Sequence, residues 1–243
     1  PLARIEDIKS MKKTLNPQTG EKILGIGEGN GYFCKEILNG IGKNGKYTVT
    51  DPSIDQLNNL KQRVNSNNLD VICASAEDLD NKIILNENFD KIWSFGAFHH
   101  VNNQTKAIEN CYKALKNGGR LVICDVFQGS KLAKHFDTQV AKYCETGHEV
   151  KFLSDEFAKS IGYLAGFKEE KIKINDLNQK WIFNTKKNLG KFIYNIHALT
   201  KIPGSEEEKI NEVIKGCQDI LGIEMENGKF YLNWPMKVLV AEK

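Results

Sequence analysis

The chain has 243 residues, of which 40% are hydrophobic and 27% charged; this balance excludes a disordered chain and is typical of a packed globular protein. Its 34 basic and 31 acidic residues leave a formal net charge of +3 without a concentrated basic run, so the composition does not indicate nucleic-acid binding. No apolar stretch approaches the roughly 20 residues that a membrane-spanning helix needs, and we expect no signal peptide because the first residues mix charged and apolar side chains.

Short strand-like runs alternate with helical patterns over the first two thirds of the chain. We predict strands at residues 22–26, 46–50, 70–73, 91–95 and 120–124, and helices at about 32–38, after an N-cap at Ser53, and at about 105–115. Several of these strands are nearly continuous in apolar residues, as expected where helices cover both faces of a sheet. The alternation favours a parallel sheet with right-handed crossovers.

The pattern changes after residue 127. A polar and aromatic stretch over 128–151 precedes a helix over 155–165, which Gly166 ends, and a strand near 170–174. Two helical patterns follow at about 189–199 and 206–221, and the chain ends in strand-like residues 229–232, a Pro235 break and strand-like residues 237–241. The sequence therefore predicts an α/β fold with a doubly wound, mostly parallel seven-stranded sheet, helices on both faces and a helical cap from two insertions.

A glycine-rich loop, with the sequence GIGEGNG over residues 25–31, follows the first predicted strand. Glycines allow a sharp turn and the close approach of a ligand, and the helix after the loop has free N–H groups at its start. Asp51 ends the second strand about twenty residues beyond the loop, where a carboxylate can bind both hydroxyls of a ribose. The combination predicts a nucleoside-type cofactor; the alternative is that the glycines only build a tight turn.

The spacing of the glycines distinguishes between nucleoside cofactors. A dinucleotide-binding loop has the pattern G-x-G-x-x-G, whose third glycine would fall on Asn30 or, two residues later, on Tyr32. The chain instead has the tighter spacing Gly27-x-Gly29-x-Gly31. The loop therefore does not match the dinucleotide-binding pattern.

Residues 24–31 resemble the first motif of the class I S-adenosylmethionine (SAM)-dependent methyltransferases. The resemblance continues at Asp51, which matches the ribose-binding acid of that family, and at residues 74–79, which resemble the segment that lies against the adenine. Residues 89–94 and 98–101 resemble the fourth strand and its following loop, and residues 115–121 resemble the turn into the fifth strand. The resemblance implies a SAM-dependent methyltransferase with a Rossmann-like core.

The same resemblance implies the cofactor-binding residues. They are Gly25, Gly27, Glu28, Gly29, Asn30, Gly31, Asp51, Pro52, Gln56, Ala76, Glu77, Asp78 and Ser94. The chain departs from the family at Gly25, because the family usually has an acid there that helps to hold the amino group of SAM. Glu28 either supplies this missing charge or is a solvated loop residue.

His99 and His100 follow the fourth predicted strand and are the candidate catalytic residues. One of them can take a proton from an acceptor hydroxyl as a general base, or both can simply shape the pocket. The two insertions, 128–151 and 175–228, follow the carboxyl ends of the fifth and sixth strands, which lie at the ligand edge of a parallel sheet. We therefore expect a cap over the cofactor, which favours a small-molecule substrate over a polymer.

The candidate substrate-binding residues are His99 and, from the cap, Tyr143, His148, Trp181 and His197. For the aromatic residues of the cap, packing between helices is the alternative explanation. The expected parts of the chain are a SAM-binding core (1–127), a cap insertion (128–151), a core helix and strand (152–174), a helical cap insertion (175–228) and a final core strand (229–243).

The six cysteines have no CxxC pair and no metal-like spacing, so we expect buried free thiols, no metal site and a cytoplasmic protein. The expected function is methyl transfer from SAM to the oxygen, nitrogen or carbon of a small molecule, with no nucleic-acid or membrane partner. The alternatives are a SAM-fold binding protein without turnover, consistent with Gly25, and an RNA or protein methyltransferase. The sequence SFGA at residues 94–97 lacks the Asn-Pro-Pro-Tyr type motif of nitrogen-methylating nucleic-acid enzymes.

Overall fold

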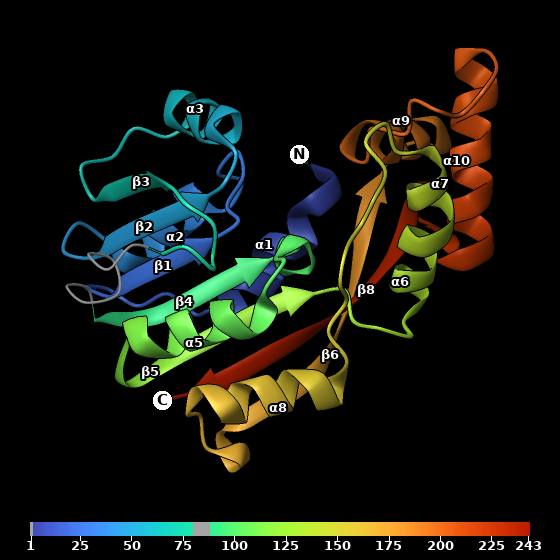
Figure 1. Cartoon of the computed structure of the whole chain (residues 1–243). Helices are drawn as coiled ribbons and strands as arrows, with labels where there is room; N and C mark the ends of the chain where they lie inside the picture. The colour runs from blue at the N-terminus through green and yellow to red at the C-terminus, as the bar shows by residue number, and fades with distance from the viewer. Residues whose placement is uncertain (1, 80–87) are drawn as a thin grey trace.

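The computed structural model describes residues 2–79 and 88–243, and these residues contain an eight-stranded sheet (Figure 1). Its strand order is β3-β2-β1-β4-β5-β8-β6, and β7 pairs with β8 beside this path. Strands β1 to β5 are parallel, whereas β8 runs antiparallel to β5, β6 and β7. The strands are β1 (Lys22–Ile26), β2 (Lys46–Asp51), β3 (Leu69–Cys73), β4 (Phe89–Phe95), β5 (Leu115–Asp125), β6 (Ile172–Phe183), β7 (Ile223–Glu226) and β8 (Lys229–Glu242).

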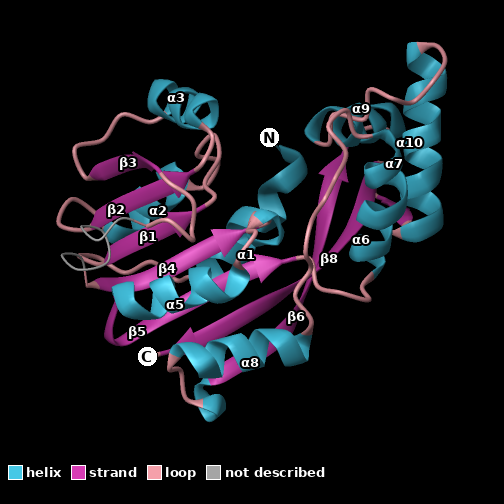
Figure 2. Cartoon of the chain, viewed as in Figure 1, coloured by secondary structure: helices cyan, strands magenta, loops and turns pink. Residues whose placement is uncertain are grey.

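Helices cover both faces of the sheet (Figure 2). Ile23 packs with α1, α2 and α3 on one face and Leu24 packs with α5 and α8 on the other, because successive side chains of a strand point to opposite faces. The α/β fold expected from the sequence is confirmed. The helices are α1 (Ile5–Thr14), α2 (Cys34–Ile41), α3 (Ile54–Arg63), η2 (Phe98–His100), α5 (Gln104–Ala114), α6 (Lys131–His135), η3 (Phe136–Val140), α7 (Ala141–Tyr143), α8 (Asp155–Ala165), α9 (Lys186–Ile196) and α10 (Glu206–Ile220). None of the described helices combines the length and the apolar character that crossing a membrane requires.

The last part of the sheet differs from the prediction. Strand β6 continues to Phe183, and residues 223–226 form the additional strand β7, so the helical part of the second insertion is shorter than the predicted 175–228. Residues 175–183 begin with a polar run, Asn-Asp-Leu-Asn-Gln-Lys, which does not read as a buried strand. The long strands β6 and β8 extend past β4 and β5, and the helices α6, α7, α9 and α10 lie around this extension (Figure 1).

Strand β8 passes through Pro235 without a break. The predicted interruption is wrong, because Pro235 lies opposite Asn178 of β6 in a continuous antiparallel ladder. On its other side, β8 pairs with β7 at residues 229–232 and with β5 at residues 237–242. Pro235 lies between these two segments, where β6 is the only strand paired with β8. The N–H that proline lacks is therefore not needed for pairing on the other side of β8.

The N-terminal helix α1 was not predicted from the sequence. Its carboxyl end is held by two cations of the sheet: Arg120 donates to the carbonyls of Thr14 and Leu15, and Lys91 donates to that of Asn16. Cations at this end of a helix satisfy carbonyl groups that have no helical partner. These contacts fix α1 against the sheet, which brings its first residues toward the cap.

Candidate active site

The glycine loop turns back over the carboxyl ends of β1 and β2. Gly27, Gly29 and Gly31 have φ values of 70°, 55° and 75°, in the region that favours glycine. A Cβ on Gly27 would lie 2.4 Å from the Cβ of Ala97, which follows β4. Glycine at position 27 therefore allows the loop and the residues after β4 to approach each other closely.

Asp51 is the last residue of β2, and its carboxylate is held at the start of the loop. Its Oδ2 accepts a hydrogen bond from the N–H of Gly29 (2.9 Å), and its Oδ1 accepts one from the N–H of Ser53 (2.9 Å). Ser53 caps α3, as predicted, by accepting from the N–H of Gln56. The fold therefore orients this carboxylate before a ligand is bound.

A cavity of about 570 Å³ opens beside Asp51, and we call it the Asp51 cavity. Asn110 donates to the carbonyls of Ala76 and Glu77, and the Glu77 carboxylate accepts from the N–H of Asn102, so the segment after β3 is fixed. The predicted cofactor residues in the lining are Gly27, Asp51, Pro52, Ala76, Glu77 and Asp78; the remaining lining residues are Ile26, Ala74, Ser75, Ala97, His100, Val101 and Asn102.

The other predicted cofactor residues lie around this cavity rather than in its lining. Gln56 is exposed, and its Oε1 lies 3.9 Å from the position of a Cβ on Gly29. Asn30 lines a separate cavity of about 350 Å³ beside Arg4 and Tyr32. Ser94 is buried at the end of β4, and its hydroxyl has no hydrogen-bond partner in the described part of the chain.

Glu28 turns inward from the loop, so of its two alternative roles the solvated loop residue is wrong. Its Oε1 accepts hydrogen bonds from the Tyr47 hydroxyl (2.5 Å) and the Trp93 indole N–H (2.8 Å). A Cβ on Gly25 would lie 2.7 Å from Cγ of Glu28, so the Glu28 side chain fills the space beside this glycine. Burial raises the pKa of the Glu28 carboxyl, against the lowering effect of these hydrogen bonds.

His99 is buried in the short helix η2 and is fixed by Asp125 at the end of β5. Its Nδ1 lies 2.6 Å from Asp125 Oδ1, and its backbone N–H donates to Asp125 Oδ2 (3.0 Å). His99 follows β4 and Asp125 ends β5. Because these strands are parallel neighbours, the two residues lie at the same edge of the sheet. The sequence analysis missed Asp125, although an acid directly after the fifth predicted strand was a usable signal.

A second cavity of about 210 Å³ lies between the core and the cap, and we call it the histidine cavity. His100 is exposed and lines both this cavity and the Asp51 cavity, so it stands at their junction. The lining residues are Arg4, Phe95, Gly96, His99, His100, Val126, Phe136, His148, Trp181, Ile196, His197, Trp234 and Met236.

Aromatic stacking fixes the cap side of the histidine cavity. Trp181 of β6 stacks on Trp234 of β8 with ring centroids 3.8 Å apart, and its indole N–H donates to Asp7 of α1 (3.0 Å). The His148 ring stacks on Phe136 at 4.8 Å. Burial and the neighbouring histidines lower the pKa of His148 to about 4, so its imidazole is neutral near pH 7.

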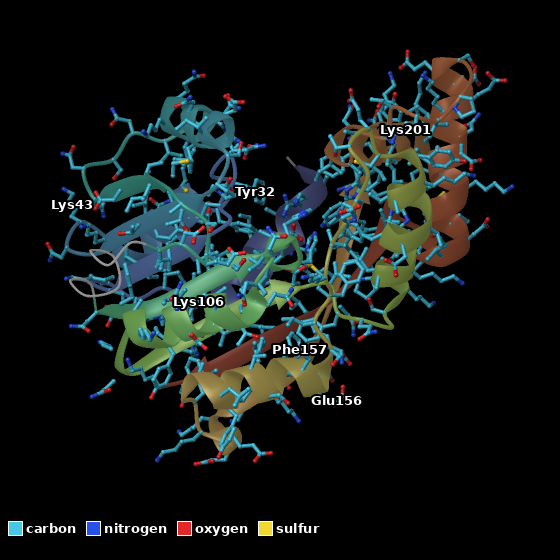
Figure 3. The ribbon with its side chains drawn as sticks, in the orientation of Figure 1. Tyr32, Lys43, Lys106, Glu156, Phe157 and Lys201 are labelled. Carbon is cyan, nitrogen blue, oxygen red and sulfur yellow. The ribbon has the colours of Figure 1, made fainter. Side chains whose placement is uncertain are left out.

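Arg4 reaches the histidine cavity from the N-terminal segment. Tyr32, which is labelled in Figure 3, donates its hydroxyl proton to the Arg4 carbonyl (2.8 Å), and the Arg4 guanidinium lies 4.6 Å from the centre of its ring. The carboxylate of Asp7 forms an ion pair with this guanidinium, so the positive charge of Arg4 is balanced within the protein. By contrast, the predicted substrate residue Tyr143 is not among the residues that line the two cavities; its hydroxyl donates to Glu212 of α10 and holds the cap helices together.

Residues 24–123 match a family model described as a methyltransferase domain, and this match spans the glycine loop, Asp51 and both histidines of η2. Over these residues the chain is similar to a methyltransferase domain. Phosphoethanolamine N-methyltransferase of Plasmodium falciparum is 29% identical over 183 residues, which are 73% of this chain and 64% of that protein. A ubiquinone/menaquinone biosynthesis C-methyltransferase, UbiE of Methylococcus capsulatus, is 27% identical over 109 residues, 44% of each chain. The chain thus spans less than two thirds of the length of these two relatives.

Solved structures share the same fold over nearly the whole chain. The YcgJ protein of Bacillus subtilis superimposes with a TM-score of 0.68 at 14% identity and covers 98% of this chain and 99% of that one. Phosphoethanolamine N-methyltransferase 2 of Haemonchus contortus, in complex with phosphomonomethylethanolamine and S-adenosylhomocysteine, gives a TM-score of 0.66 at 16% identity, covering 98% of this chain and 52% of that one. The cap belongs to the shared fold, because the superpositions include it.

SAM is the cofactor, and the residues around the Asp51 cavity fit it. Gly27 and Asp51 both line this cavity, and the Asp51 carboxylate is placed to accept from ribose hydroxyls. When bound, SAM supplies a methyl group on a positively charged sulfur, which is a good electrophile. The protein then has to hold an acceptor in line with that group and to take any proton that must leave.

Proposed function

We propose that this protein is a class I SAM-dependent methyltransferase, which transfers the methyl group of SAM to a small-molecule acceptor held in the histidine cavity. The observation that carries the proposal is the position of His100, which lines both the Asp51 cavity and the histidine cavity. A cofactor site and an acceptor site must meet where the methyl group crosses, and the two cavities meet at this residue. The cofactor-binding roles of residues 25–31, Asp51 and residues 74–78 belong to the same proposal.

The histidine cavity supports a small acceptor rather than a polymer. It is lined by residues of the core, of the first insertion and of β6, α9 and β8, and its volume of about 210 Å³ is room for a small molecule. A folded RNA or protein would need an open surface to bring a nucleotide or side chain to the methyl group. The free thiols further support a reducing compartment such as the cytoplasm.

His99 is the residue that we propose as general base, and Asp125 positions it. With the Nδ1 proton donated to Asp125, Nε2 of His99 carries the lone pair and can take a proton from a hydroxyl or an ammonium group of the acceptor. Among the relatives, the names record both nitrogen and carbon acceptors. A base is useful for a nitrogen acceptor and for a carbon acceptor, since each has to lose a proton in the course of methyl transfer.

The test uses SAM with a deuterated methyl group and the small-molecule fraction of a cell extract. We expect a labelled small molecule to form with the wild-type protein, and far less of it with His99→Asn or Asp125→Asn. Those two variants should still bind SAM, because their side chains lie outside the Asp51 cavity. Label that enters only the RNA or protein fraction would contradict the proposal.

Gly25 favours a second candidate, a SAM-fold protein that binds the cofactor without turnover. The usual acid is absent at this position, and the space is filled by Glu28, whose carboxylate is already bonded to Tyr47 and Trp93. Stoichiometric SAM binding without a labelled product in any fraction would support this candidate. A labelled product would exclude it.

A further inference from the structure

Three histidines converge in the histidine cavity from two distant parts of the chain. His99 and His100 come from η2, and His148 comes from the coil between α7 and α8. One ring nitrogen from each of the three lies within 4.8 Å of the other two. We infer that His99, His100 and His148 form a binding site for a divalent transition-metal ion of the zinc type. No metal site is expected from the sequence, because the cysteines have no metal-like spacing and His148 lies far along the chain from His99 and His100.

Asp125 is the first observation that favours a metal over a simple hydrogen-bonding role. Histidines that bind metals usually donate their second ring N–H to a carboxylate or a carbonyl, which fixes the ring and makes the other nitrogen a better ligand. The His99 ring has this arrangement, with Nδ1 at 2.6 Å from Asp125 Oδ1 and both groups buried. His99 would therefore be the fixed ligand, bound through Nε2; with a metal in place this nitrogen is not available as a general base, so the two roles of His99 are mutually exclusive.

Unpartnered ring nitrogens are the second observation. Nδ1 of His148 is buried and has no hydrogen-bond partner among the described residues, and the same holds for Nε2 of His197 in the same cavity. A buried polar atom without a partner destabilises the fold, and a bound group that satisfies it removes this cost. The His148 ring lies beside the two other histidines, and a cation bound there would give its ring a polar partner.

The distances between the three ring nitrogens, up to 4.8 Å, are longer than those of an occupied metal site. In a tetrahedral zinc site with Zn–N bonds of about 2.0–2.1 Å, the nitrogens lie about 3.3 Å apart. His100 is exposed, and His148 lies on a coil, so both rings can move toward the fixed His99. Three imidazoles without a thiolate suit zinc, nickel or cobalt, and three protein ligands leave a position open toward the cavity.

The charges around the site do not oppose a cation. Arg4 also lines the histidine cavity, but its guanidinium is paired with Asp7, whose carboxylate is buried. Asp125 adds a carboxylate directly behind His99. The open position faces the space that we assign to the acceptor, so an oxygen or nitrogen atom of the acceptor could complete the coordination.

The test uses the full chain, from which a chelator has first removed any metal. This protein is titrated with Co²⁺ in the absence of SAM and acceptor. We expect one Co²⁺ per chain with visible absorption bands typical of four- or five-coordinate cobalt, displaced by Zn²⁺. His148→Gln should abolish stoichiometric binding, and Asp125→Asn should weaken it about 10–100-fold. His197→Gln, a histidine of the same cavity outside the three, is the matched control and should retain binding.

Circular dichroism of each variant identifies any that fail to fold, and His148→Gln is the most secure because its side chain lies on a coil. Absence of the visible bands in the wild-type protein would overturn the proposal, and so would bands that His148→Gln leaves unchanged. Binding of inorganic phosphate in place of cobalt would also overturn it and would make the histidines hydrogen-bond donors. Because neither SAM nor methyl transfer is involved, this result is independent of the methyltransferase assay.

Discussion

Both carboxylate oxygens of Asp51 accept hydrogen bonds from backbone N–H groups, one in the glycine loop and one at the start of α3. The carboxylate therefore links the two segments that border the cofactor cavity. A ribose would add further hydrogen bonds to a group that already has a fixed orientation, so little conformational entropy is lost when it binds.

Replacing Asp51 with alanine should weaken SAM binding by about 1–3 kcal/mol, the usual effect of removing one partner of a buried polar group. Isothermal titration calorimetry measures the change. Asp55→Ala is the matched control, because Asp55 is an exposed acid in the first turn of α3. Equal SAM affinity in the wild-type and Asp51→Ala proteins would contradict the ribose-binding role.

Glu28→Gln tests whether Glu28 replaces the acid that position 25 lacks. Glutamine has the same shape and can still accept from Tyr47 and Trp93, so we expect the fold to be kept. Loss of the charge should weaken SAM, which carries an ammonium group, by roughly 1.5–3 kcal/mol and adenosine much less. Burial raises the pKa of Glu28, so the ionised fraction and the selective loss should both grow as the pH rises. Equal losses for the two ligands, measured by calorimetry at several pH values, would exclude the charge role.

Strands β6 and β8 are the elements that connect the core to the cap. The two halves of β8 have different neighbours on the side away from β6: residues 237–242 pair with β5, whereas residues 229–232 pair with β7. The extension carries Trp181 and Trp234 to the histidine cavity, where they stack on each other. The length of two strands, more than any cap helix, therefore decides where the acceptor site lies.

The cap should respond to ligand mainly in the coil at residues 144–150. Leu189 and Ile193 of α9 and Leu132 of α6 are buried in the same core cluster as the sheet, so these helices are held firmly. The coil carries His148 between α7 and α8 and has few regular hydrogen bonds. A segment of this kind opens at low cost, and opening is needed to admit an acceptor.

We expect amide hydrogen exchange in residues 144–150 to slow when SAM is added, while exchange in β1, β4 and β5 changes little. Mass spectrometry of exchanged peptides measures both regions in one experiment. The Asp51→Ala variant at the same SAM concentration is the control, because it should bind less cofactor and show less protection. An unresponsive coil in the wild-type protein would argue against a lid and for an acceptor site that is open to solvent.

At the scale of the whole molecule, the five histidines of the chain gather around one cavity. His99, His100, His148 and His197 line it, and the ring of His135 lies 6.2 Å from that of His197. They come from η2, α6, the coil after α7 and the end of α9. Sequence reasoning treated His148 and His197 as isolated candidates, because nothing in their local sequence indicates that the fold brings them together.

The sequence by itself determined the core and the cofactor loop. Glycines at positions 27, 29 and 31 are required by their backbone conformation, and Asp51 follows from the strand that it ends; both signals are local and can be read residue by residue. Only the tertiary structure decided the inward turn of Glu28 onto Tyr47 and Trp93, the pairing of His99 with Asp125, and the approach of His148 to η2. These contacts join side chains that are separated along the chain, and their distances depend on strand register and packing, which no local pattern specifies.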